Sequence, residues 1–106
     1  MPLVEVAKTS EIPEGEARRF VVERVEIAVA NAGEGRFFAV DDICSHAESS
    51  LSEGEVDTDD CTIECPRHGS TFDLRTGRPR TLPATLPVVT FPVKVEGDTI
   101  LIELDH

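Results

Sequence analysis

Two cysteine–histidine pairs constrain this chain more than any other feature. Cys44 and His46 are separated by one residue, and Cys65 and His68, twenty-one positions further on, by two. The pairs use two of the three cysteines and two of the three histidines among 106 residues. Thiolates are strong ligands for zinc and iron, and neutral imidazole is a good borderline ligand. The pattern therefore predicts a metal centre to which two loops each supply one sulfur and one nitrogen.

The order of the Cys and His residues along the chain indicates which kind of metal centre is favoured. Structural zinc sites usually group two cysteines closely and two histidines separately. Here each pair mixes the two residue types. That distribution suits a two-iron cluster in which two thiolates bind one iron and two imidazoles bind the other. From the residues alone, a structural zinc site remains open as an alternative.

Charge and composition restrict the partners and the compartment. Ten basic and twenty-one acidic residues give a net charge of -11, which argues against nucleic acid and against anionic membrane surfaces. No apolar run approaches the roughly twenty residues of a membrane span, and the first ten residues do not have the pattern of a secretory signal. An odd number of cysteines argues against a disulfide scaffold. We expect a cytoplasmic protein without a nucleic-acid or membrane partner.

Short β-branched runs between turn residues predict an all-β fold. A chain of this length forms one domain, 1–106. The expected strands cover about residues 2–8, 18–23, 25–31, 36–42 and 61–65, a hairpin at 70–79, and two final strands within 88–104. The stretch 41–69 is instead polar, acidic and poor in strand signal, and long loops in small domains are usually functional or disordered. The Cys and His residues therefore lie on an excursion over about 42–74.

The spacing C-x-H, eighteen residues, then C-x-x-H-G resembles the Rieske iron–sulfur motif, and nearly the whole chain is similar to a small Rieske-type ferredoxin. The resemblance implies a Rieske-type antiparallel β-sandwich with a small cluster-binding subdomain. It also implies one [2Fe-2S] cluster of the Rieske type. Cys44 and Cys65 would then bind the buried iron, and His46 and His68 the outer iron.

Departures from the high-potential members of the family bear on the reduction potential. Those members carry a disulfide between the cluster loops, whereas the corresponding positions here are Ser49 and Arg67. Ser70 keeps one hydroxyl that donates to cluster sulfur in the family, but Phe72 lacks the second. The resemblance therefore implies a potential at the low end of the Rieske range of about −150 to +300 mV.

By resemblance, the chain is a soluble one-electron carrier and not an enzyme. It would pass electrons from a flavin-dependent ferredoxin reductase to a terminal oxygenase or another redox acceptor, as a monomer. The length leaves no room for the mononuclear iron domain of an oxygenase subunit. Three alternatives remain open: a subunit like the small subunit of nitrite reductases, a ferredoxin for iron–sulfur assembly, and a structural zinc protein.

Some residues are expected to lie outside the cluster chemistry. Cys61 is expected to be a structural thiol, because a third thiolate would break the ligand set, and His106 is the terminal residue. Leu51 and Pro83 resemble family positions that cover the cluster. The acidic segment 53–60 has two open interpretations: a docking face for a basic reductase, or a solvated loop.

Overall fold

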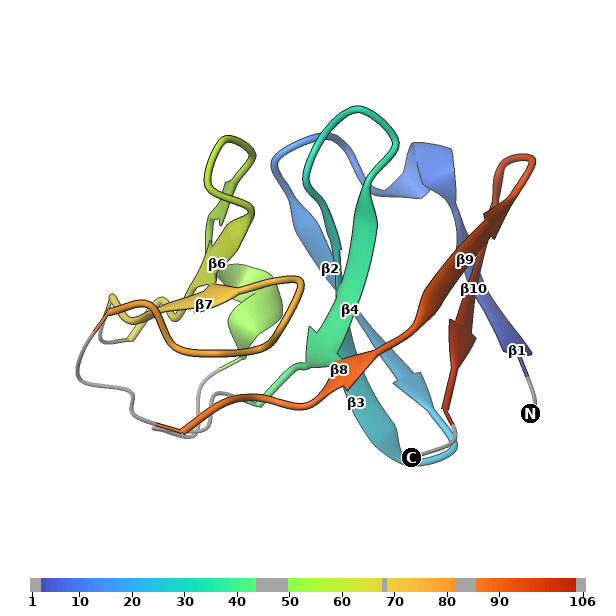
Figure 1. The fold of residues 1–106 in the computed structure, drawn as a ribbon. Helices are drawn as coiled ribbons and strands as arrows, with labels where there is room; N and C mark the ends of the chain where they lie inside the picture. Colours follow the sequence, from blue (N-terminus) through green and yellow to red (C-terminus); the bar gives the residue numbers. More distant parts are fainter. Residues whose placement is uncertain (1–2, 44–49, 68, 82–85, 105–106) are drawn as a thin grey trace.

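The computed structural model describes residues 3–43, 50–67, 69–81 and 86–104. In these ranges the chain forms antiparallel sheets with the strand orders β1-β10-β9, β2-β3-β4-β8 and β5-β6-β7 (Figure 1). The strands are β1 (Leu3–Lys8), β2 (Ala17–Val22), β3 (Val25–Asn31), β4 (Phe37–Asp41), β5 (Val56–Asp57), β6 (Thr62–Glu64), β7 (Thr71–Asp73), β8 (Thr90–Phe91), β9 (Val93–Glu96) and β10 (Thr99–Glu103). Two 3-10 turns, η1 (Thr9–Glu11) and η2 (Leu51–Glu53), complete the elements. The all-β prediction is confirmed.

The hairpin between β3 and β4 forms where the glycines predict it. Gly33 and Gly35 have φ values of 89° and 74°, a left-handed backbone that glycine adopts without a Cβ clash. The side-chain oxygen of Asn31 accepts the Gly33 N–H at 2.9 Å, and its amide donates to the Ile12 carbonyl at 2.8 Å. Asn31 therefore fixes both the turn and the loop before β2.

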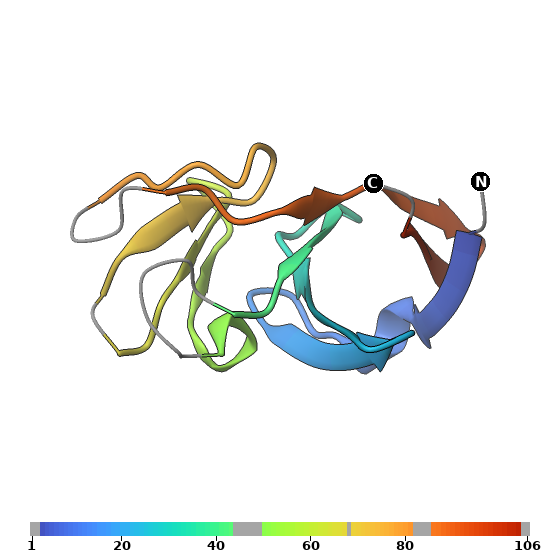
Figure 2. The same cartoon turned by 90° about the horizontal axis from the view of Figure 1, so that it is seen from below.

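Alternate residues of β3 belong to two different hydrophobic cores. Ile27 and Val29 pack between the four-stranded sheet and the β1-β10-β9 sheet, with Ile100 and Ile102 of β10. The alanines of β3 belong to the other core, under the β5-β6-β7 sheet. We call this second core the distal core; its buried residues are Ala17, Ala28, Ala30, Ala32, Val40, Leu51, Val56, Cys61, Ile63, Cys65, Phe72, Leu74 and Val88. Figure 2 shows the two outer sheets on opposite sides of β3 and β4.

The first of the two expected C-terminal strands is divided. Pro92 separates β8, which pairs with β4, from β9, which pairs with β10. Proline has no N–H for a strand ladder, so it is found where pairing stops or changes. The Pro92 carbonyl still accepts the Glu103 N–H at 3.0 Å. The chain therefore crosses from one sheet to the other at this residue.

The polar excursion contains more structure than its sequence predicts. Leu51 in η2 and Val56 in β5 are both buried, although the residues between them are largely polar. Conversely, β6 is shorter than expected, because Cys61 has a φ of 59° and lies before the strand. Cys61, Ile63 and Cys65 are all buried, and the burial of Cys61 was not predicted from the sequence.

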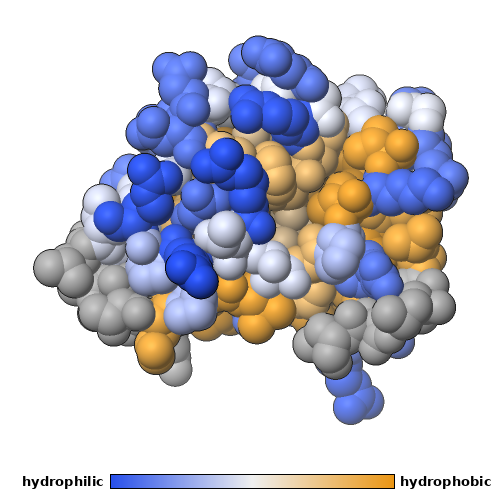
Figure 3. Space-filling view, viewed as in Figure 1, coloured by the Kyte–Doolittle hydropathy of each residue, from blue (hydrophilic) through white to orange (hydrophobic). Residues whose placement is uncertain are grey.

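On the face in Figure 3, hydrophilic side chains gather over the part of the molecule that holds β6 and β7. Hydrophobic side chains are more common toward β4 and β9. No helix in the described ranges is long and apolar enough to cross a bilayer.

Candidate metal centre

Only part of the predicted ligand set can be placed. Cys65 is described, whereas Cys44, His46 and His68 lie outside the described residues. The same holds for Ser49, Pro83 and His106. The described residues thus include Cys65 and the chain on either side of both predicted loops.

Cys65 begins a closed turn between β6 and β7. Its N–H donates to the Ser70 carbonyl at 2.6 Å, and its carbonyl accepts the Gly69 N–H at 2.9 Å. Gly69 has a φ of 76°, which strongly favours glycine over any side chain. Cys65 and Ser70 are fully buried, whereas Pro66, Arg67 and Gly69 are exposed. The C-P-R-H-G stretch therefore holds a buried thiol at the start of a tight surface turn.

The base of the other predicted loop is closed by Asp42. The Leu51 N–H donates to the Asp42 backbone carbonyl at 2.7 Å, and Ile43 forms a β-bridge with Ser50. The Asp42 carboxylate accepts the Ser50 hydroxyl at 2.5 Å and the Ser52 N–H at 2.8 Å. These contacts hold residues 43 and 50 together.

Asp42 is a residue that the sequence analysis missed. It is 1% exposed, and its carboxylate lies 3.4 Å from Nε of Arg19, which also pairs with Glu26. The available signal was an acidic residue at the end of a strand, with serines eight and ten positions later. That signal is weak, because short polar residues around a turn are common.

The ends of the two loops are joined in the structure. The Glu64 N–H donates to the Glu55 carbonyl at 2.9 Å, which pairs the segment after η2 with β6 immediately before Cys65. Gly54 packs so tightly there that an added Cβ would lie 1.6 Å from the Glu64 carbonyl oxygen. Leu51 also shares the distal core with Cys65. The chain leaving the first loop is therefore fixed against the strand that enters the second.

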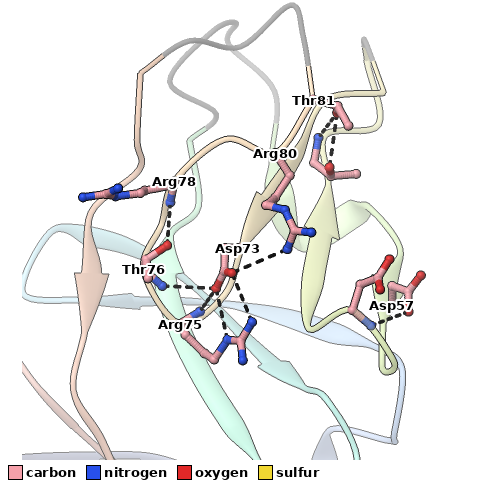
Figure 4. A network of polar contacts seen from close by, with 9 residues as sticks. Asp57, Asp73, Arg75, Thr76, Arg78, Arg80 and Thr81 are labelled. Carbon is pink, nitrogen blue, oxygen red and sulfur yellow. Dashed lines mark hydrogen bonds and ion pairs between the residues drawn. The ribbon is translucent and has the colours of Figure 1, made fainter.

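Asp73 stabilises the hairpin that follows the second loop (Figure 4). Its carboxylate accepts the backbone N–H groups of Arg75 and Thr76 at 2.8 and 3.3 Å, and pairs with the guanidinium of Arg75 at 3.3 Å. Arg80 lies 3.7 Å from the same carboxylate. Burial on its own would raise the pKa of Asp73, but the hydrogen bonds and charge of Arg75, with the Thr76 N–H, outweigh it and lower that pKa. Asp73 is therefore held as a carboxylate.

A second contact in Figure 4 connects the loop to the segment after the hairpin. The Thr71 N–H donates to the Thr81 hydroxyl at 2.8 Å, and that hydroxyl lies 3.5 Å from the Gly69 carbonyl. Gly69 and Thr71 flank Ser70, so both ends of this short stretch are fixed by Thr81. The turn at Cys65 is thus supported from the strand behind it and from the segment after β7.

Cys61 has the environment of a structural thiol. It is 2% exposed and belongs to the distal core, and neither it nor Cys65 forms a disulfide. Burial raises the pKa of the Cys61 thiol, and the charges of Arg75 and Arg36 offset only part of that effect. That Cys61 is not a ligand stays a prediction, because the proposed ligand Cys65 is buried in the same core.

Cys65 fits a metal site with an enclosed sulfur ligand. A thiolate is the metal-binding form of cysteine, and a buried thiolate is costly unless a cation compensates its charge. Cys65 presents such a thiol at a turn with the left-handed glycine needed for a tight bend. A cysteine thiolate of this kind is a ligand in iron–sulfur clusters and in zinc sites alike.

Comparison with known proteins shows the family to which this chain belongs. The family model described as the Rieske [2Fe-2S] domain matches residues 3–92. The ferredoxin subunit of 3-phenylpropionate/cinnamic acid dioxygenase from Escherichia coli (strain K12) is 50% identical over 95 residues, covering 90% of this chain and 87% of that protein.

Solved structures from dioxygenase systems are also similar to this chain. The ferredoxin of carbazole 1,9a-dioxygenase from Nocardioides aromaticivorans IC177 superposes with a TM-score of 0.91 at 36% identity, covering 96% of this chain and 97% of that one. A complex of reduced oxygenase and oxidized ferredoxin in carbazole 1,9a-dioxygenase contains a chain that matches with a TM-score of 0.85 at 37% identity, covering 94% of this chain and all of that one.

Proposed function

This chain belongs to the Rieske [2Fe-2S] family and is an electron carrier with one Rieske-type cluster, and we propose that Cys44 and Cys65 bind one iron and His46 and His68 the other. The observation that carries this assignment is the buried Cys65 at the closed turn between β6 and β7. The C-x-H and C-x-x-H-G spacing supports the other three ligands. The family match favours the cluster over the zinc alternative.

The cluster supplies reversible one-electron chemistry, and the chain holds and encloses it. Asp42 closes the base of the first loop, and the bonds of Cys65 with Gly69 and Ser70 close the second. The distal core around Cys65 excludes water from the thiolate side, since Leu51 and other core side chains there are fully buried. Water exclusion on the Cys65 side limits the rearrangement that accompanies electron transfer.

We further propose the place of this carrier between its redox partners. The electron donor is a flavin-dependent ferredoxin reductase, and the acceptor is the terminal oxygenase of a system that oxidises aromatic compounds. The related ferredoxin subunit belongs to a dioxygenase for 3-phenylpropionate and cinnamic acid, and a similar ferredoxin occurs in a complex with its oxygenase. The chain acts as a monomer and a single domain, 1–106. The odd cysteine count is consistent with work in the reducing cytoplasm.

The ligand assignment is tested by single substitutions read by iron and acid-labile sulfide content. Cys44→Ser, Cys65→Ser, His46→Ala and His68→Ala should each lose most of the iron, whereas Cys61→Ser should keep it. His68→Cys should lower the reduction potential or lose the cluster, because a thiolate replaces a neutral ligand. A Cys65→Ser protein with full iron and sulfide would overturn the assignment.

The partner assignment has its own test. The purified protein is added to the reductase and oxygenase components of a 3-phenylpropionate dioxygenase system that lacks its ferredoxin. NADH-dependent product formation should then depend on this chain and be absent with the Cys65→Ser protein. A protein with full iron content that restores no turnover would contradict an oxygenase acceptor of this kind.

A further inference from the structure

A side chain completes the pairing of β7, an edge strand of the β5-β6-β7 sheet. The chain returns along the free edge of β7, where Phe72 forms a β-bridge with Pro79. The Arg80 N–H donates to the Thr71 carbonyl at 2.6 Å. The Thr71 N–H donates to the hydroxyl of Thr81 at 2.8 Å. Thr81 thus supplies with its side chain the acceptor that a backbone carbonyl supplies in an ordinary antiparallel ladder.

The same hydroxyl reaches the other side of Ser70. Its oxygen lies 3.5 Å from the Gly69 carbonyl, to which it donates, and 3.2 Å from the Thr71 hydroxyl. A hydroxyl carries one donor and two acceptor positions, so all these contacts can form together. Gly69 directly follows the proposed ligand His68 in the sequence. The Thr81 side chain therefore contacts both peptide groups that flank Ser70.

A single peptide group links Thr81 to Cys65. The group between Ser70 and Thr71 accepts the Cys65 N–H at its carbonyl, at 2.6 Å, and donates its own N–H to Thr81. The Cys65 carbonyl in turn accepts the Gly69 N–H at 2.9 Å. Hydrogen bonds that share a peptide group polarise and strengthen one another. A displacement of the Thr81 hydroxyl is therefore transmitted to Cys65 across one rigid group.

We propose that Thr81 is a positioning residue for the cluster, acting on Cys65 through the peptide group between Ser70 and Thr71. The proposal rests on the proposed function, in which Cys65 is an iron ligand. Groups that orient the ligands of a metal tune how firmly it is held and how it behaves electronically. The role of Thr81 is to hold the turn in place, not to bind iron.

The test uses three single variants. Thr81→Val removes the hydroxyl and keeps the branched shape, and Thr81→Ser keeps the hydroxyl. Thr81 is exposed, so neither change opens a cavity in the distal core. The control is Thr76→Val, because the Thr76 hydroxyl accepts the backbone N–H of Arg78 at 3.2 Å in the same hairpin (Figure 4). It removes an exposed bond of the same kind that has no connection to Cys65.

Iron and acid-labile sulfide are measured first in the unaltered protein. A protein without two iron and two sulfide per chain would contradict the proposed function itself. A loaded protein whose variants all behave alike would contradict only the positioning role. The two failures are therefore distinguishable.

The first readout is the rate at which an iron chelator bleaches the visible absorption, below the unfolding temperature of every variant. Thr81→Val should bleach about 2- to 10-fold faster than the unaltered protein, the factor expected for the loss of one hydrogen bond that holds the turn closed. Thr81→Ser and Thr76→Val should stay close to the unaltered rate. Equal rates for Thr81→Val and Thr76→Val would overturn the proposal.

The second readout is the electron paramagnetic resonance spectrum of the reduced protein, which depends on how the ligands are arranged around the iron. Thr81→Val should shift or broaden its g values, and Thr81→Ser should show those of the unaltered protein. A purely structural contribution would lower the unfolding temperature of Thr81→Val and Thr76→Val and leave both spectra unchanged. That result would also overturn the proposal.

Discussion

The carboxylate of Asp42 accepts the backbone N–H of Ser52 at 2.8 Å, across the base of the first cluster loop. The same carboxylate accepts the Ser50 hydroxyl and faces Arg19. A buried carboxylate with a cation and several donors is stable in place, but it leaves costly unpaired groups behind when it is removed. Asp42 thus holds together the described residues on either side of 44–49.

Asp42→Ala should therefore weaken the fold and release iron faster. Removing the carboxylate leaves the Ser50 hydroxyl and the Ser52 N–H without their acceptor, and an unsatisfied buried donor costs about 1–3 kcal/mol, so we expect a loss of unfolding free energy of that order. Bleaching of the visible absorption in the presence of an iron chelator measures cluster release at a temperature where each variant remains folded.

The matched control is Asn31→Ala, which removes one hydrogen bond in the β3–β4 turn and one to the Ile12 carbonyl in the loop before β2. It should lower stability while leaving the bleaching rate close to that of the unaltered protein. Equal bleaching rates for the Asp42 and Asn31 variants would show that Asp42 has only a general structural role.

Asp73 should make the protein sensitive to acid. Its pKa in the folded state lies below the ordinary value, despite a burial effect in the opposite direction, because Arg75 and the Thr76 N–H stabilise the carboxylate. A lowered folded pKa stabilises the fold above the unfolded value and loses that effect as the pH falls toward the folded pKa. Urea unfolding between about pH 6 and 3 should show a smaller acid-dependent loss of stability in Asp73→Asn than in the unaltered protein. Parallel curves would contradict this role.

Cys61 should react slowly with alkylating reagents while the protein is folded. Its thiol is buried and burial raises its pKa, so little reactive thiolate is accessible at neutral pH. Mass spectrometry of peptides after iodoacetamide treatment should find Cys61 unmodified in the native protein and modified in urea. Rapid native modification at this residue would mean that the distal core is open there.

Gly54→Ala should destabilise the fold, although Gly54 has a backbone conformation that other residues also adopt. The added Cβ would lie 1.6 Å from the Glu64 carbonyl oxygen, so η2 and β6 would have to move apart. Overpacking of this kind typically costs about 1–3 kcal/mol. Gly35→Ala serves for comparison: its φ is 74°, but nothing lies within 4 Å of the added Cβ. A Gly54→Ala protein that unfolds at the temperature of the unaltered protein would refute the close packing.

Local patterns predicted most of the strands, because alternation and turn glycines are encoded within a few residues. The hairpin at Gly33 and Gly35 illustrates this. The change of sheet at Pro92 was not predicted, since the sequence does not say which strands are partners. The two-residue β5 is too short to show a period.

The candidate site also has a part that the sequence predicts and a part that only the folded structure shows. The metal-binding pattern of Cys44, His46, Cys65 and His68 is a matter of residue type and spacing, and it can be read directly from the sequence. The role of Asp42 depends on contacts with Arg19 and with chain eight to ten residues later, so it appears only in the fold.

The most direct test of the central claim is the iron and acid-labile sulfide content of the freshly purified protein, measured together with zinc. The account predicts about two iron and two sulfide per chain, in a red-brown protein that bleaches on reduction. One zinc per chain without sulfide would contradict it and would make the Cys65 turn part of a structural metal site.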